Sequence, residues 1–354
     1  MARQNPGAAW RLVLAWSVFI GVFGALLGAC SERGAEARLA DYLQRLSRAL
    51  DADFNPPAPA PAPAPPQAPS LQLRLEGSRV DGLDFLRLRG CALQTTVARR
   101  NSSLGRLAPP SQRLLLELAF LREAPACIDR LRDGGDEALA ALLAEAEAQK
   151  RRQLPALIFN ATLGNREFRD FWRGSDALDN YPEETSSLVV TALERIDTDT
   201  RRWLGGDYRA DESRFELALS DISRGDGGEL LRALQLQTTY LAGADRALDQ
   251  RLSRGELCRE GLLPGAAPIL RTVVRQYFIG GIQPWSAAVN QRYHELLTPL
   301  QSLQRQLEAV LPDRYRQWRA RLAAILARGR AAPLQHVRRL QALLGPCYAE
   351  FQRG

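Results

Sequence analysis

The amino-acid sequence predicts an all-α protein, and three observations support that fold class. From residue 80 onwards, apolar residues recur at spacings of three and four, which is the period of an amphipathic helix. Alternation of apolar and polar residues is confined to the short segment 71–77, which is either one strand or an extended linker. Prolines and glycines interrupt the helical pattern repeatedly. We therefore predict a bundle of about ten helices, preceded by a signal peptide and a Pro/Ala-rich tether.

The first thirty residues have the layout of a secretory signal. Arg3 and Arg11 are the only charged residues before Cys30, and an uncharged, mostly apolar run separates Arg11 from that cysteine. Leucine, glycine, alanine and cysteine at 27–30 resemble the lipobox of bacterial lipoproteins, in which the cysteine sulphur receives a lipid and the chain is cut before it. The alternative is an uncleaved membrane helix, because about 18 apolar residues just span a bilayer. We predict a signal peptide at 1–29 and lipidation of Cys30.

The residue after the cysteine indicates the destination. It is Ser31 rather than the aspartate that often marks inner-membrane retention in such lipoproteins, so the resemblance implies an outer-membrane anchor facing the periplasm. We do not expect nucleic acid as a partner, because the export signal directs the chain out of the cytoplasm. The formal charge of +7 is compatible with an anionic envelope polymer or an envelope protein as a partner.

Four cysteines remain beyond Cys30, an even number for an oxidising compartment. We favour the pairs nearest in sequence, Cys91–Cys127 and Cys258–Cys347, although three connectivities and buried free thiols stay open. We expect Cys91 to lie in a helix, so its bridge requires a bend in the chain. The cysteines lack a CxxC spacing or a nearby histidine, and we expect neither a metal nor a cofactor.

Residues 30–70 divide into a lipidated start, a short helix and a spacer. Leucines at 39, 43, 46 and 50 share one helical face within residues 30–55. Eight prolines then follow between Pro56 and Pro69, and proline favours extended backbone. We expect residues 56–70 to be a tether reaching about 40 Å at ~3.1 Å per residue, with a ligand for a proline-binding domain as the alternative.

The remaining residues, 71–354, are expected to form a single all-α domain. Ser111 is a plausible N-cap, and residues 155–182 suggest short helices packed by their aromatic residues. Gly280 and Gly281 indicate a helix break next to Trp285, which we assign to the core rather than to a contact surface. We predict helices over 80–101, 111–131, 135–152, 183–204, 211–224, 227–254, 284–309, 313–328 and 333–344.

Catalytic motifs are not evident. His294 is followed by glutamate, but residue 298 is Thr298 where a zinc-binding helix needs its second histidine. We place His294 at the surface or the edge of the core. Glu183 and Glu184 are the most suggestive pair of carboxylates for glycan hydrolysis. Acids after Pro182 are also ordinary first-turn residues of a helix, which is the interpretation we favour.

The loop 98–112 is the best candidate for binding a ligand. It carries Arg99, Arg100, Asn101, Ser102, Ser103 and Arg106. Guanidinium groups and loop amides suit an anion such as a phosphate or a carboxylate. A well-capped turn between two helices is the structural alternative.

Several phrases together resemble an uncharacterised family of proteobacterial lipoproteins, the DUF3080 domain of unknown function. These are the lipobox, "RNSSLG" and "PPSQRLL" within 85–121, "FNAT" at 159–162 and "FRDFW" at 168–172. The resemblance covers nearly the whole chain and implies a similar location. It brings no activity and no catalytic residue.

We therefore expect a non-catalytic helical binding or assembly module, anchored in the bacterial envelope. The alternative is an envelope hydrolase of glycans or lipids that uses paired carboxylates. A cleft with two facing acids would favour the enzyme, and an apolar or arginine-rich patch without such a cleft would favour binding.

Overall fold

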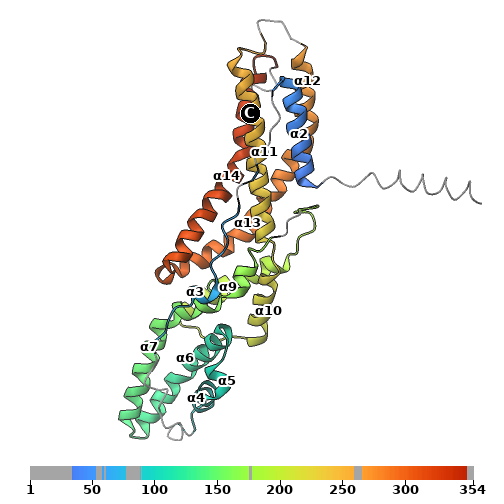
Figure 1. The fold of residues 1–354 in the computed structure, drawn as a ribbon. Coiled ribbons are helices and arrows are strands. Elements are labelled where there is room, and N and C mark those ends of the chain that lie inside the picture. The colour runs from blue at the N-terminus through green and yellow to red at the C-terminus, as the bar shows by residue number, and fades with distance from the viewer. Residues whose placement is uncertain are drawn as a thin grey trace, which may run out of the picture.

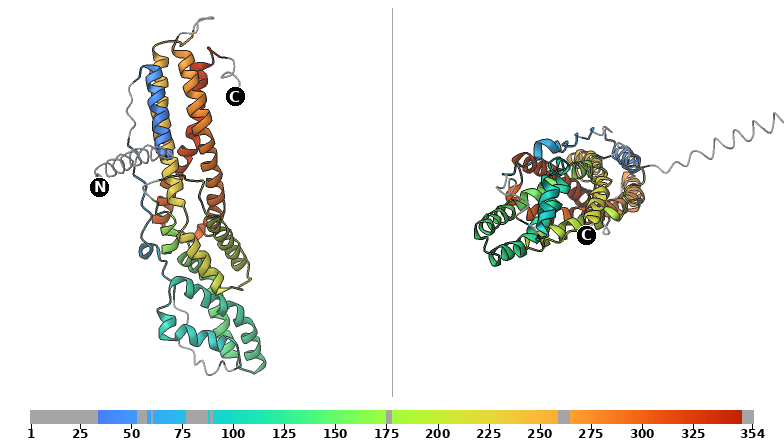
Figure 2. Two further views of the ribbon diagram at one scale, coloured as in Figure 1. Left: turned by 90° about the vertical axis from the view of Figure 1, so that its right-hand side faces the viewer. Right: turned by 90° about the horizontal axis from the view of Figure 1, so that it is seen from below.

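The computed structural model describes residues 34–52, 58–59, 61–76, 88, 90–174, 178–258 and 265–348. The predicted signal peptide and Cys30 lie outside these ranges. Within them every regular element is a helix, which confirms the all-α fold class. Figures 1 and 2 show an elongated molecule, with a long bundle at one end and a smaller group of helices at the other.

The helices follow the predicted order with several differences in their bounds. They are α2 (Ala35–Leu50), α3 (Ala68–Leu71), α4 (Leu93–Asn101), α5 (Ser103–Arg106), α6 (Pro110–Asp133), α7 (Glu137–Ala161), α8 (Arg166–Asp170), α9 (Leu188–Leu204), α10 (Glu212–Ser223), α11 (Gly227–Ser253), α12 (Ala266–Val273), the π-helix η3 (Val274–Ile282), α13 (Gln283–Gln306), the 3₁₀ turn η4 (Glu308–Val310) and α14 (Asp313–Leu344).

The long bundle contains α2, α11, α12, α13 and α14 (Figure 1). The leucine face predicted for the first helix is buried here, because Leu39, Leu43, Leu46 and Leu50 of α2 all lie in the main hydrophobic core. The predicted gap between 328 and 333 does not exist. Helix α14 continues through Pro333, and Gly329 of α14 packs against the backbone of Leu234 in α11. A side chain at 329 would keep these two helices apart.

A buried hydrogen-bond chain joins α2 to the rest of the bundle. The Tyr42 hydroxyl lies 2.6 Å from Nε2 of His336, and Nδ1 of His336 lies 2.6 Å from Oδ1 of Asp245. A carboxylate only accepts, so Nδ1 carries the proton and Nε2 accepts from Tyr42. Burial, followed by the Asp245 charge, raises the pKa of Tyr42 well above its ordinary value. Helix α2 is therefore part of the folded body.

The Pro/Ala-rich segment also contacts the body, which corrects the expectation of a free tether. The indole Nε1 of Trp318 donates to the carbonyl oxygen of Pro63 at 3.0 Å, and Arg169 donates to the side chain of Gln67. Figure 1 shows residues 61–67 running beside the bundle to α3. Proline has no backbone N–H, so a proline-rich segment supplies few donors of its own, and the carbonyl of Pro63 accepts from a neighbouring helix instead.

The middle of the molecule is organised around one buried arginine. Arg292 of α13 binds both carboxylate oxygens of Asp226, at 2.9 and 2.6 Å, and donates to the carbonyl of Ser186. The Tyr181 hydroxyl donates to the same aspartate.

Trp285 is buried and donates to the carbonyl of Tyr181, which confirms its assignment to the core. The predicted aromatic packing of residues 155–182 is confirmed as well, because all five aromatic side chains are buried: Phe159, Phe168, Phe171, Trp172 and Tyr181.

Proline and glycine interrupt helices less than the sequence predicts. Helix α7 continues through Pro155 to Ala161, and α6 begins at Pro110 rather than after an N-cap at Ser111. At Gly280–Gly281 the chain does not break but forms the π-helix η3, which continues directly into α13. Packing on both sides of these helices outweighs the loss of single backbone hydrogen bonds.

The smaller end of the molecule is formed by α4, α6 and α7 around a second hydrophobic cluster. Phe120, Ile128, Leu139 and Leu143 are among its buried members. The two long helices α6 and α7 are antiparallel neighbours joined by a short turn, and both also reach the main core. This arrangement holds the predicted anion loop between α4 and α6, at the side of a rigid helix pair.

Candidate functional site

The predicted anion loop is a short, tightly bonded turn that contains α5. Ser102 caps this helix, because its hydroxyl accepts from the backbone N–H of Gly105 at 3.0 Å and donates to the carbonyl of Arg99 at 2.7 Å. Gly105 packs directly on the preceding helix. A Cβ atom at 105 would lie 2.1 Å from the carbonyl oxygen of Arg99 and 2.5 Å from that of Arg100. Glycine is therefore required for α5 to fold back onto the end of α4.

Below the loop lies a buried group of three charges from three helices. The carboxylate of Glu117 in α6 is 2.6 Å from Nε of Arg100 in α4 and 2.6 Å from Nζ of Lys150 in α7. Only 5% of the Glu117 side chain and 4% of the Lys150 side chain are exposed. Burial lowers the pKa of Lys150, and the neighbouring Arg100 charge adds to that effect while Glu117 opposes it. Two cations thus share one carboxylate.

An extended chain segment forms another wall of the site. Residues 72–76 have no regular structure, so the linker alternative for "LQLRLEG" is confirmed and the strand is not. The side chain of Asn160 in α7 bonds this segment as a neighbouring strand would, accepting from the N–H of Leu73 at 2.8 Å and donating to its carbonyl at 2.9 Å. Gln153 donates to the carbonyl of Glu76. Lys150, Gln153, Leu157 and Asn160 share one face of α7.

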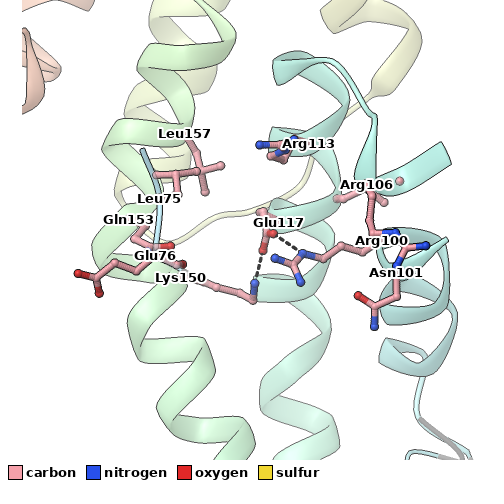
Figure 3. A pocket seen from close by; sticks show the side chains of 12 residues that line it. Leu75, Glu76, Arg100, Asn101, Arg106, Arg113, Glu117, Lys150, Gln153 and Leu157 are labelled. Carbon is pink, nitrogen blue, oxygen red and sulfur yellow. Dashed lines mark hydrogen bonds and ion pairs between the residues drawn. The ribbon is translucent and has the colours of Figure 1, made fainter. Parts of the chain in front are cut away.

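These parts enclose an open cavity of about 370 Å³ (Figure 3). Arg106 and Arg113 are exposed there, and neither has an ion pair with any described residue. Four cations against two carboxylates leave the lining with a formal charge of +2. The guanidinium groups of arginine can donate two parallel hydrogen bonds to a phosphate or a carboxylate group at such a site. The lining residues are Leu75, Glu76, Arg100, Asn101, Gly105, Arg106, Arg113, Leu116, Glu117, Lys150, Gln153 and Leu157.

The structure brings together some of the predicted loop residues and separates others. Arg100, Asn101 and Arg106 line the cavity. Arg99 faces a smaller neighbouring cavity of about 130 Å³ between α6 and residues 208–212. Ser102 acts as a helix cap, and Ser103 is exposed without lining the cavity. The loop is a capped turn, as the structural alternative predicts, and anion binding by its arginines stays a prediction.

The sequence reasoning missed Glu117 and Lys150. A signal was present, because Lys150 is the only lysine in a chain with 47 basic residues. Glutamate and lysine in the middle of predicted helices are ordinarily solvent-exposed, so neither stood out. Arg113 follows the loop in the sequence and shares a helical face with Glu117 four residues later.

Both favoured disulfides are present. Cys91 pairs with Cys127 and Cys258 pairs with Cys347, each with Cα atoms 5.4 Å apart. Cys91 does not lie in a helix as expected but in the turn before α4. The turn supplies the bend that the pairing requires, and the bridge ties the start of α4 to α6.

The other candidate residues lie away from the cavity. Glu183 and Glu184 are exposed neighbours in the turn before α9, and neither lines the cavity described above. His294 is exposed and contacts Arg330, which agrees with its surface assignment. Among the described residues, no group of acidic, histidine or cysteine side chains is arranged to hold a metal ion. In the same residues, no helix has the length and apolar character needed to cross a membrane.

Comparison with known proteins identifies the family. The family model described as "Protein of unknown function (DUF3080)" matches residues 39–350, which is most of the chain. The chain belongs to the DUF3080 family. The match begins within α2 and ends beyond α14, so the DUF3080 region includes most of α2 and the Pro/Ala-rich segment as well as the cavity. No curated protein and no solved structure matches the chain.

Proposed function

We propose that this DUF3080 protein is a lipid-anchored protein of the bacterial envelope that binds an anionic group of an envelope component in the cavity. The observation that carries the proposal is the pair Arg106 and Arg113, which line the cavity without an acidic partner among the described residues. Guanidinium groups form charge-assisted hydrogen bonds to anions that are about twice as strong as neutral hydrogen bonds. A phosphate or carboxylate would supply the missing negative charge.

The proposed location rests on the sequence before the described residues. Residues 27–30 resemble a lipobox, and Ser31 favours the outer membrane. The two disulfides support an oxidising compartment such as the periplasm. Mass spectrometry of the protein from membranes tests this part. We expect an N-terminal peptide that starts at Cys30 and carries acyl chains, and a C30S variant that is not processed.

The charges in the cavity support binding rather than catalysis. Glu117 is the buried acid of the site, and both of its oxygens are held by cations at 2.6 Å. A general acid must present its carboxyl oxygen to the ligand, and here both oxygens are already bound to side-chain cations. The second acid, Glu76, comes from the extended segment and contributes to the wall. The arrangement lacks the facing pair of acids that a glycosidase uses.

Calorimetric titration of the full chain with inorganic phosphate tests the binding site. Each of R106Q and R113Q should weaken the phosphate affinity by about tenfold, the value of one charge-assisted hydrogen bond to an ion. R328Q is the matched control, because Arg328 is also exposed and without an ion pair among the described residues. Equal phosphate affinity in all three variants would refute the anion site. Cleavage of peptidoglycan by the purified protein would contradict the non-catalytic role.

A further inference from the structure

The loop beside the cavity presents two leucines to solvent. Leu104 is 82% exposed and Leu107 is 85% exposed, more than any other large hydrophobic residue in the described part of the chain. Isolated exposed leucines are common on protein surfaces. This pair differs because both side chains lie in one four-residue helix and its C-cap, next to a cavity that is rich in arginine.

The loop holds these leucines in a fixed position. Ser102 caps α5, and the N–H groups of Arg106 and Leu107 donate to the carbonyls of Ser102 and Ser103. Gly105 leaves no space between α5 and the end of α4. Pro110 then starts α6, which continues as a rigid helix of 24 residues. The backbone that carries the leucines is therefore already ordered before they enter an apolar phase, which lowers the entropy cost of insertion.

The chain segment that carries the leucines has charges of one sign. Residues 85–116 contain six arginines and no aspartate or glutamate. Arg99, Arg106 and Arg113 are exposed, and none of the three has an ion pair with a described residue. Apolar side chains flanked by arginines are complementary to the surface of a bilayer that contains anionic lipids. Guanidinium groups reach the phosphates there while the leucines enter the outer acyl region.

We propose that α5 docks onto an anionic lipid surface, with Leu104 and Leu107 inserted and Arg99, Arg106 and Arg113 bound to lipid phosphates. This inference rests on the proposed function, because it names a lipid headgroup as the anion that the cavity binds. A protein partner is the competing occupant, but the leucines are few, and the chain segment that carries them has only positive charges. Both features favour a fluid, negatively charged surface over a shaped one.

The position of the lipid anchor is compatible with this contact. Four residues separate Cys30 from the first residue of α2, so a lipid on Cys30 keeps the start of α2 within about 18 Å of the membrane. Figure 1 shows the start of α2 part-way along the molecule, with α4 and α5 towards the lower end. An anchor at this point leaves either end free to approach the bilayer. The charge and the leucines select the end that carries α5.

A fluorescent probe beside the leucines tests the proposal in the full chain. An S103C variant labelled with an environment-sensitive dye keeps both leucines, and peptide mapping verifies the labelled position. The protein is reconstituted into vesicles of phosphatidylethanolamine with phosphatidylglycerol, or of phosphatidylcholine alone. We expect blue-shifted emission, and quenching by nitroxide-labelled lipids, in the anionic vesicles only. S253C is the matched control, because Ser253 is an exposed serine at the end of α11 and should show neither effect.

Two further variants separate the leucines from the arginines. L104Q/L107Q should abolish the blue shift while leaving phosphate binding unchanged, since neither leucine lines the cavity. R106Q/R113Q should lower the ratio of docked to undocked probe by about fivefold for each arginine. Phosphate binding without any blue shift would overturn the lipid docking and leave the anion site intact. Equal blue shifts in anionic and neutral vesicles, or a shift only after a protein partner is added, would also overturn it.

Discussion

Removal of the Lys150 amine should destabilise the smaller end of the molecule strongly. At 2.6 Å the Lys150–Glu117 attraction is about 6 kcal/mol for an effective dielectric of 20, which is similar to the cost of burying both ions. The intact pair therefore contributes little net stability. A K150M variant removes this attraction and leaves Glu117 desolvated, with Arg100 as its one remaining cation among the pairs described above. Breaking one partner of a buried pair costs about 3–5 kcal/mol.

The assay is chemical unfolding of the oxidised protein, followed by circular dichroism. K150M should lower the free energy of unfolding by about 3–5 kcal/mol. The double variant K150M/E117L should recover part of this loss, because packed apolar side chains replace the buried pair. Arg100 loses its bond to Glu117 in this variant, but its side chain is 24% exposed and reaches solvent. R151M is the matched control on the same helix. Its exposed pair with Glu147 should contribute at most about 0.5 kcal/mol.

Two results would refute the reasoning about Lys150. A loss below about 1 kcal/mol for K150M would mean that Glu117 rehydrates easily and that the group is not effectively buried. A double variant that is less stable than either single variant would mean that the site requires the ion pair itself. In that case the three charges would be required for the packing of α4, α6 and α7, and apolar side chains could not replace them.

Four other predictions concern separate parts of the molecule. Burial lowers the pKa of Lys150, so between that lowered value and 10.5 the unfolded chain binds more protons than the folded chain. The free energy of unfolding of the wild-type protein should therefore rise relative to that of K150M as the pH increases through this window. Chemical unfolding at pH values from 8 to 9.5 measures this difference. Y42F removes the donor to Nε2 of His336 and should cost about 1–3 kcal/mol, whereas a change within 0.5 kcal/mol would contradict the hydrogen-bond chain. G105A should cost about 1–3 kcal/mol and weaken phosphate binding, because its Cβ displaces α5; unchanged affinity would show that α5 does not position the site. Replacing Cys258 and Cys347 by serine opens a loop of 89 residues and should cost up to about 4.5 kcal/mol, provided that the wild-type pair is verified by peptide mapping.

Local sequence patterns determined the fold class and much of the secondary structure. The leucines of α2 repeat with the helical period, so their common face could be assigned without knowing what covers it. Ser102 and Gly105 are turn residues whose preferences act over a few positions, and a capped turn is one of the two interpretations that the sequence of this loop supports. Interactions of this kind depend on near neighbours in the chain, which the sequence displays directly.

Tertiary packing decided what proline and glycine do in this molecule. Pro155 and Pro333 lie inside continuous helices, and Gly280–Gly281 lies in a π-helix, because surrounding helices stabilise these segments more than one lost hydrogen bond destabilises them. The Pro/Ala-rich segment has the composition of a free spacer, yet Trp318 binds it through a backbone carbonyl 255 positions away. Composition cannot indicate a partner at that separation.

The cavity also depended on contacts that are distant in the sequence. Arginines in the loop suggested an anion site, but Glu117 and Lys150 resemble solvent-exposed residues until α6 and α7 pack together and exclude water from them. Asn160 bonds a segment 87 positions earlier and so completes the wall beside Lys150. The charges that surround a side chain, and the water that it loses, are properties of the folded arrangement rather than of its neighbours along the chain.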